Sequence, residues 1–157
     1  MYILGVDPGL MGALSVVDIS TSPATIVKAT LMPKIKRNTR SELDIYKVAE
    51  FISEFKTTIK FAVFEDVAAM PGQGVVSMFT FGKVTGVVLG VLGAHNIPIV
   101  FVKPFIWKLA YDLSSDKSLS FKKASELFPN NIDLWTKKAH EGIAEASILG
   151  HYGSRFF

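Results

Sequence analysis

The sequence predicts an α/β domain built on a mixed five-stranded sheet that is flanked by helices. Apolar segments follow the order strand, strand, strand, helix, strand, helix, strand, and then helices only. Residues 3–6 and 13–17 are short apolar runs separated by the turn-rich residues 7–12, which predicts an antiparallel hairpin. Helices connect the later strands, which favours parallel pairing there.

The composition agrees with one compact domain over residues 1–157. The chain has 49% apolar and 20% charged residues, and a domain of this length buries roughly 68–70% of its unfolded surface. It contains no Cys, which excludes disulfides and a thiol nucleophile and favours a reducing, cytoplasmic setting. The first residues carry no basic run typical of a signal peptide, and the densest apolar stretch, residues 84–94, is shorter than the ~20 residues that span a bilayer. We therefore expect no membrane association.

The first half continues with a strand at residues 25–31 and a cationic segment. Residues 33–40 contain four cations, which predicts a solvent-exposed loop. Thr39 with Glu42 fits a capping box that opens a helix running to about residue 56. The continuous apolar run 61–64 predicts a buried central strand.

The second half begins with helical spacing over residues 74–94. Gly82, Gly86 and Gly90 recur every four residues there, although Gly inside a helix costs about 1 kcal/mol relative to Ala. We expect this stripe to pack closely against a sheet or a second subunit. A strand at 97–102 and helices at 104–112, from 116 or 118 to 128, and at 138–152 complete the chain.

Two carboxylates follow predicted central strands directly. Asp7 ends the first strand and Glu65 ends the strand at 61–64. Ligands of open α/β sheets bind at the carboxyl ends of strands, and a carboxylate buried there needs a cation or several donors. Otherwise each acid marks only the surface edge of its strand.

A second acidic pair lies in the last helix. Glu141 and Glu145 are four residues apart and share one face, where like charges destabilise a helix unless a cation lies between them. The alternative is a solvated face on which Lys137 or Lys138 pairs with Glu141. Oxygen ligands in a chain without Cys favour Mg²⁺ or Mn²⁺ over zinc. His140 and Lys138 are candidates for orienting water or a phosphate.

The ordered set of motifs resembles the RuvC-type Holliday junction resolvases, particularly their bacteriophage-type branch. The matching segments span about residues 1–153 and include Met-Pro-Gly-Gln-Gly; they are residues 5–13, 64–67, 70–82, 102–108, 127–129 and 141–146. The resemblance implies an RNase H-like fold, a homodimer, and a host-cytoplasmic endonuclease that cleaves branched DNA without a small-molecule cofactor. It also implies two Mg²⁺ or Mn²⁺ ions per active site, held by Asp7, Glu65, Glu141 and Glu145.

Two departures from the family pattern affect these expectations. Members of the family usually have Asp at one or both last-helix positions, whereas this chain has Glu at both. A Glu side chain has one more rotatable bond, so we expect a looser site that works better with Mn²⁺ than with Mg²⁺. Ala68, Ala69 and Met70 replace the aromatic residue with which bacterial members stack on the junction.

The charge distribution suits a DNA partner. No Asp or Glu occurs between Val67 and Tyr111, and with four site carboxylates bound to metal, 17 cations face 10 remaining acids. Trp107 is a candidate for stacking on a base or for the core. The candidate phosphate contacts are Lys34, Lys36, Arg37, Arg40, Lys83, Lys103, Lys108, Lys117, Lys122, Lys123 and Lys138.

Two other functions are compatible with parts of the pattern. A catalytically weak branched-DNA-binding protein would use the same basic surface with a poor metal site. A sugar-kinase-like or actin-like ATPase also begins with a strand followed by Asp-x-Gly, but it needs two such domains and about twice this length.

Overall fold

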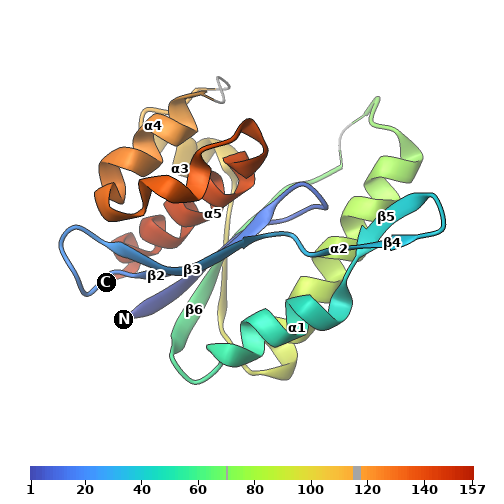
Figure 1. Ribbon diagram of the computed structural model, residues 1–157, viewed down its shortest axis with the longest axis horizontal. Coiled ribbons are helices and arrows are strands. Elements are labelled where there is room, and N and C mark those ends of the chain that lie inside the picture. Colours follow the sequence, from blue (N-terminus) through green and yellow to red (C-terminus); the bar gives the residue numbers. More distant parts are fainter. Residues whose placement is uncertain (70, 115–117) are drawn as a thin grey trace.

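The computed structural model describes residues 1–69, 71–114 and 118–157 and has the predicted α/β architecture, with a mixed sheet between two layers of helices (Figure 1). The main sheet has the order β3-β2-β1-β6-β7; β1 pairs antiparallel with β2 and parallel with β6. Its strands are β1 (Tyr2–Asp7), β2 (Ala13–Asp18), β3 (Thr25–Leu31), β6 (Ile59–Glu65) and β7 (Ile99–Val102). The predicted fold class is confirmed.

Helices cover both faces of this sheet. The α-helices are α1 (Ile45–Glu54), α2 (Val75–Ala94), α3 (Pro104–Ala110), α4 (Ser118–Leu127) and α5 (Glu141–Tyr152). Short 3₁₀ helices occupy Pro129–Trp135, Lys138–His140 and Gly153–Phe156. α1 and α2 pack on one face around Leu4 and Phe64, while α3, α4 and α5 pack on the other around Ile3 and Val63. The predicted helix start at residue 116 lies outside the described residues.

The cationic segment after β3 is a β-ribbon, and the prediction of a loop is wrong there. β4 (Lys34–Arg37) pairs antiparallel with β5 (Arg40–Leu43) in a separate two-stranded sheet. Asn38 at the turn has φ 56°, a left-handed conformation that Asn tolerates better than most residues. Thr39 and Glu42, the predicted capping box, belong to the turn and the second strand of the ribbon, so α1 begins later, at Ile45. Its N-cap is Asp44, whose carboxylate accepts a hydrogen bond from the Lys47 backbone N–H at 3.1 Å.

The outer face of α2 is apolar and unusually exposed. By length and composition alone α2 is long and apolar enough to cross a membrane, because the helix includes residues before the apolar stretch 84–94. The helix begins at Val75, before that stretch, and Lys83 near its middle is its one charged residue. Val84, Val88 and Leu92 nevertheless pack in the core against the sheet. One side of α2 is therefore part of the domain.

The glycine stripe on α2 does not pack against the sheet. A Cβ added at Gly82, Gly86 or Gly90 would meet nothing within 4 Å, which corrects the sheet-packing alternative. These glycines lie on the side of α2 that faces away from the core. Packing against a second subunit stays a prediction.

Close packing of α5 on β1 depends on Gly5. A Cβ at Gly5 would lie 1.8 Å from the Ala146 carbonyl oxygen, and this backbone has no room to shift because α5 is buried along its length. A buried hydrogen bond between the Ser15 and Ser147 hydroxyls, 2.8 Å, fixes the same helix to β2. The absence of a side chain at Gly5 thus sets where α5 lies relative to the end of β1.

Gly5→Ala is expected to lower the free energy of unfolding by about 3 kcal/mol or more, because it forces α5 off the sheet. Urea denaturation followed by circular dichroism measures the loss. Gly93→Ala is the matched control, since a Cβ there meets nothing within 4 Å. The control should be neutral or stabilising by up to about 1 kcal/mol. Equal stability of the two variants would contradict the packing described.

Candidate active site

The sheet brings the two strand-end carboxylates to one edge. β1 and β6 are parallel neighbours in which Val6 pairs with Phe64, so Asp7 and Glu65 follow side by side. Gly9 adopts φ 112° in the turn after Asp7, a conformation that favours glycine. A Cβ at Gly12 would lie 2.1 Å from the Asp7 carbonyl oxygen, so only glycine lets the turn fold back onto Asp7.

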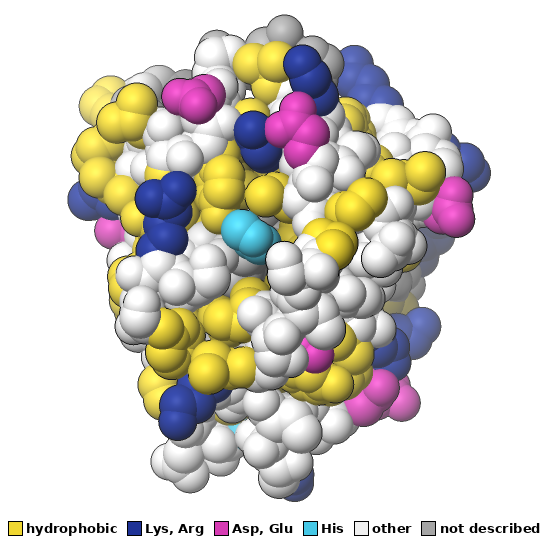
Figure 2. All heavy atoms as spheres, turned by 90° about the vertical axis from the view of Figure 1, so that its left-hand side faces the viewer, with side chains coloured by type: hydrophobic (Ala, Val, Ile, Leu, Met, Phe, Trp, Pro, Cys, Tyr) yellow, Lys and Arg dark blue, Asp and Glu magenta, His cyan; other side chains and the backbone are white. Residues whose placement is uncertain are grey.

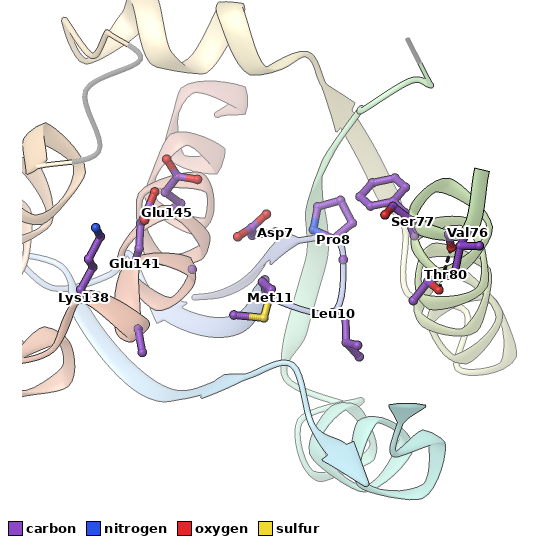
Figure 3. Close-up of a pocket in the computed structure, with 15 residues that line it drawn as sticks. Asp7, Pro8, Leu10, Met11, Val76, Ser77, Thr80, Lys138, Glu141 and Glu145 are labelled. Carbon is purple, nitrogen blue, oxygen red and sulfur yellow. Dashed lines mark hydrogen bonds between the residues drawn. The ribbon is translucent and has the colours of Figure 1, made fainter. Parts of the chain in front are cut away.

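Helix α5 brings the second pair to the same place. A Cβ at Gly142 would lie 3.0 Å from the Met11 carbonyl oxygen, which shows how closely the first turn of α5 abuts the loop after β1. Asp7, Glu141 and Glu145 consequently line one cavity of about 730 Å³. Figure 3 shows the two α5 carboxylates on one side of this cavity and Asp7 beside them. Ser77, Thr80 and Phe81 of α2 form the opposite wall.

Glu65 lies behind this cavity rather than in its wall. Its side chain is 8% exposed, and its Oε1 accepts a hydrogen bond from the Trp107 indole Nε1–H at 2.9 Å. Trp107 is fully buried, so it belongs to the core and does not stack on bases. The indole instead fixes the orientation of Glu65, a contact that the sequence did not reveal.

Lys108 lies among the carboxylates. Its Nζ is 3.2 Å from Glu145 Oε1 and 5.2 Å from the centroid of the Trp107 ring. The Ser120 hydroxyl donates a second hydrogen bond to the same Glu145 oxygen, at 3.1 Å. The prediction of Lys108 as a surface phosphate contact is therefore incomplete, because this ammonium already compensates acidic charge inside the site.

The electrostatics of the site disfavour the ionised forms of Asp7 and Glu65. Burial, followed by the nearby charges of Glu65, Glu145 and Glu141, raises the pKa of Asp7 well above 3.8, although Lys108 opposes the shift. Burial and the charge of Glu145 also raise the pKa of Glu65, against the Trp107 hydrogen bond and Lys108. Four acids with one ammonium among them have an excess of negative charge.

That excess, together with a donor set made of hard oxygens, fits divalent cations such as Mg²⁺ or Mn²⁺. In the part of the chain that the structure describes, no three His, Asp or Glu side chains are close enough to hold one ion. Glu65 and Glu145 are turned toward Trp107 and Lys108 respectively. Placing three of these carboxylates around one ion would therefore require side-chain movement.

The remaining candidates are distributed unevenly. Lys138 lines the cavity, whereas His140 does not, and its Nδ1 is buried without a hydrogen-bond partner among the described residues. Lys103 pairs with Asp66 at 3.2 Å and Lys123 with Glu126 at 2.8 Å. Lys117 and Met70 lie outside the described residues.

The other predicted cations form two groups. Lys122 lies on α4, next to Lys123. Figure 2 shows the side of the molecule to which α4 belongs, where positive side chains are separated by apolar and acidic ones. The second group lies around the ribbon and α2; its members are Lys34, Lys36, Arg37, Arg40 and Lys83.

Sequence reasoning missed Ser120 and the cavity wall on α2. Ser120 has no motif of its own, and only the fold of α4 against α5 places it beside Glu145. The contribution of α2 to the cavity wall could have been predicted, because residues 70–82 already carried the most specific part of the family resemblance.

Comparison with known proteins supports this architecture. No protein-family model matches the chain, and neither does any curated protein sequence. Among solved structures, Thermus thermophilus RuvC in complex with Holliday junction substrate superposes with a TM-score of 0.69 at 17% identity, covering 99% of this chain and 96% of RuvC. The fowlpox virus Holliday junction resolvase superposes with a TM-score of 0.62 at 17% identity over 100% of both chains. The chain therefore has the RNase H-like fold of the RuvC-type Holliday junction resolvases.

Proposed function

We propose that this protein is a divalent-metal-dependent endonuclease that cleaves branched DNA such as Holliday junctions. The observation that carries the proposal is the open cavity in which Asp7, Glu141 and Glu145 meet at the carboxyl edge of the sheet, with Glu65 directly behind. The resolvase fold supports the same function, since solved structures of that fold hold Holliday junction DNA.

Asp7, Glu65, Glu141 and Glu145 are the residues that would hold the ions. Two bound Mg²⁺ or Mn²⁺ ions would supply an activated water and stabilise the charge that develops on the phosphate and the leaving oxygen. Asp7 lies centrally between Glu65 and the α5 pair, so it is the best candidate to serve both positions.

The protein side chains supply orientation and charge. The Trp107 indole holds Glu65 in place, and Lys108 with Ser120 holds Glu145. If the Glu145 carboxylate held a cation, the Lys108 ammonium would no longer be needed to compensate its charge and would be available to a DNA phosphate. Lys138, at the cavity wall, is a second phosphate ligand.

Cleavage of end-labelled four-way, forked and linear DNA tests this function. We expect cutting of the branched substrates in Mn²⁺, slower cutting in Mg²⁺ at equal concentration because both α5 acids are Glu, and none with a chelator. Equal cutting of linear DNA would refute branch selectivity. Tight junction binding without cleavage in either metal would favour the alternative, a catalytically weak branched-DNA-binding protein.

The protein is expected to act as a homodimer, since resolving a junction requires paired cuts. The exposed outer face of α2 supports this, because Val75 and Phe79 are exposed beside the glycine stripe. Gly86→Phe leaves the core untouched but blocks close approach, so it should weaken dimerisation by about tenfold or more. Sedimentation velocity measures the change, with Lys122→Phe on the opposite helical layer as the control. A wild-type protein that stays monomeric with and without DNA would contradict the prediction.

A further inference from the structure

The β4–β5 ribbon has a structure that its own packing does not explain. All four residues of β4 are exposed, and the ribbon is separate from the main sheet. Two-stranded ribbons are marginally stable alone. This one is closed at its base by a hydrogen bond from the Asp44 N–H to the Pro33 carbonyl, 2.9 Å. The chain thus maintains an ordered, protruding and strongly cationic element rather than a loop.

The ribbon is one wall of a groove that also includes α2. A cavity of about 450 Å³ lies between the ribbon, the start of α1 and the middle of α2. Lys36 and Arg37 reach it from β4, and Lys83 reaches it from α2. Figure 1 shows the ribbon lying beside α2. Cations far apart in sequence are therefore brought to one groove by the fold.

The two acidic side chains that line this groove already interact with other groups of the protein. Glu42 lies 3.7 Å from Arg37 across the ribbon, and Asp44 caps α1. The walls between the charges are formed by Ile35, Val87 and Tyr46, whose ring is 81% exposed. An exposed Tyr hydroxyl and adjacent ammonium and guanidinium groups are the donors that proteins use on DNA phosphates.

The base of the ribbon lies next to the candidate active site. Lys34, the first residue of the ribbon, places its Nζ 3.1 Å from Met11 Sδ, and Met11 lines the carboxylate cavity. DNA held along the ribbon would therefore come close to that cavity at the Lys34 end. Two-stranded ribbons are also narrow enough to lie in a DNA major groove.

We infer that the β4–β5 ribbon and Lys83 form an arm-binding site for duplex DNA, separate from the cleavage site, that holds the phosphate backbone of one arm of the branched substrate. This inference rests on the proposed function. The ribbon contributes to the affinity for DNA and to the position of the bound arm, and it takes no part in cleavage of the phosphodiester bond.

The test is junction binding by Lys36→Ala/Arg37→Ala, measured by fluorescence anisotropy with a chelator present to prevent cleavage. We expect Kd to rise roughly 5–20-fold and the slope of log K against log salt to fall by up to about 2, since each lost phosphate contact removes about one unit. Lys56→Ala/Lys60→Ala is the matched control; these exposed lysines flank the start of β6, at the opposite edge of the sheet from the carboxylates. Lys83→Gln, which leaves the ribbon intact, should weaken binding in the same direction.

Two further readouts separate the possible outcomes. As the junction arms are shortened, the difference between wild type and the ribbon variant should disappear, and single-turnover cleavage at saturating protein should be unchanged. Equal binding by the ribbon variant and the control at every arm length would overturn the inference and leave the proposed function intact. A ribbon variant that loses affinity only because it no longer dimerises would also overturn it, since the groove would then belong to an interface between copies. Failure of the wild type to bind any junction would refute both.

Discussion

Asp7→Asn is expected to reduce junction cleavage by on the order of 10³-fold or more while binding of the junction survives. The charges of the other three carboxylates each raise the pKa of Asp7, so Asp7 is the acid that is coupled to all of them. The Asn side chain keeps the size of Asp and loses its charge. Cleavage rates under single-turnover conditions, with binding measured in parallel, give the result. Equal cleavage by the variant and the wild type would contradict the proposal that Asp7 belongs to a catalytic metal site.

The same substitution should stabilise the metal-free fold. Because its pKa is raised by folding, Asp7 binds its proton more tightly in the native state than in the unfolded state. Wild-type stability therefore falls as pH rises from about 3.8 through the native pKa of Asp7. Asp7→Asn removes this loss, and above that window we expect a gain on the order of 1 kcal/mol, or roughly 2–4 °C in Tm. Thermal melts of both proteins in chelator across this pH range measure it, and a less stable variant at neutral pH would contradict the account.

Glu145→Gln should be nearly inactive, with a loss of on the order of 10²-fold or more, whereas Glu141→Gln should be partly rescued by excess Mn²⁺. The asymmetry has a structural basis. Glu145 contacts Lys108 and Ser120 and raises the pKa of both Asp7 and Glu65, while Glu141 is the weakest of the influences on Asp7. Cleavage as a function of Mn²⁺ concentration distinguishes the variants. If both follow the wild-type curve, these two acids are only a solvated helix face.

The sheet and its carboxylates were predictable because they depend on local patterns. Four apolar residues followed by an acid identify a strand that ends at a ligand-binding edge, and this was enough to place Asp7 and Glu65. The spacing of Glu141 and Glu145 placed both on one face of α5. The fold then places Asp7, Glu141 and Glu145 around one cavity, whereas Glu65 is not part of its lining.

What the sequence did not predict depends on tertiary contacts. The cations of residues 33–40 predicted a solvated loop, and Thr39 with Glu42 predicted the start of a helix, whereas backbone pairing makes residues 34–43 a ribbon. Lys108 looks like any surface lysine until α3 packs beside α5 and brings its ammonium to Glu145. The stripe of α2 glycines suggested contact with the sheet, yet the packed side of that helix is formed by Val84, Val88 and Leu92.

Anomalous diffraction from crystals of the protein soaked in MnCl₂ tests the central claim most directly. Our account predicts manganese peaks in the cavity lined by Asp7, Glu141 and Glu145, with the Glu145 carboxylate turned from Lys108 toward the ion. Crystals of Asp7→Asn grown in parallel should lose the peak next to residue 7. An empty cavity with the Lys108–Glu145 pair intact in wild-type crystals, or manganese bound only elsewhere, would contradict the assignment of this site.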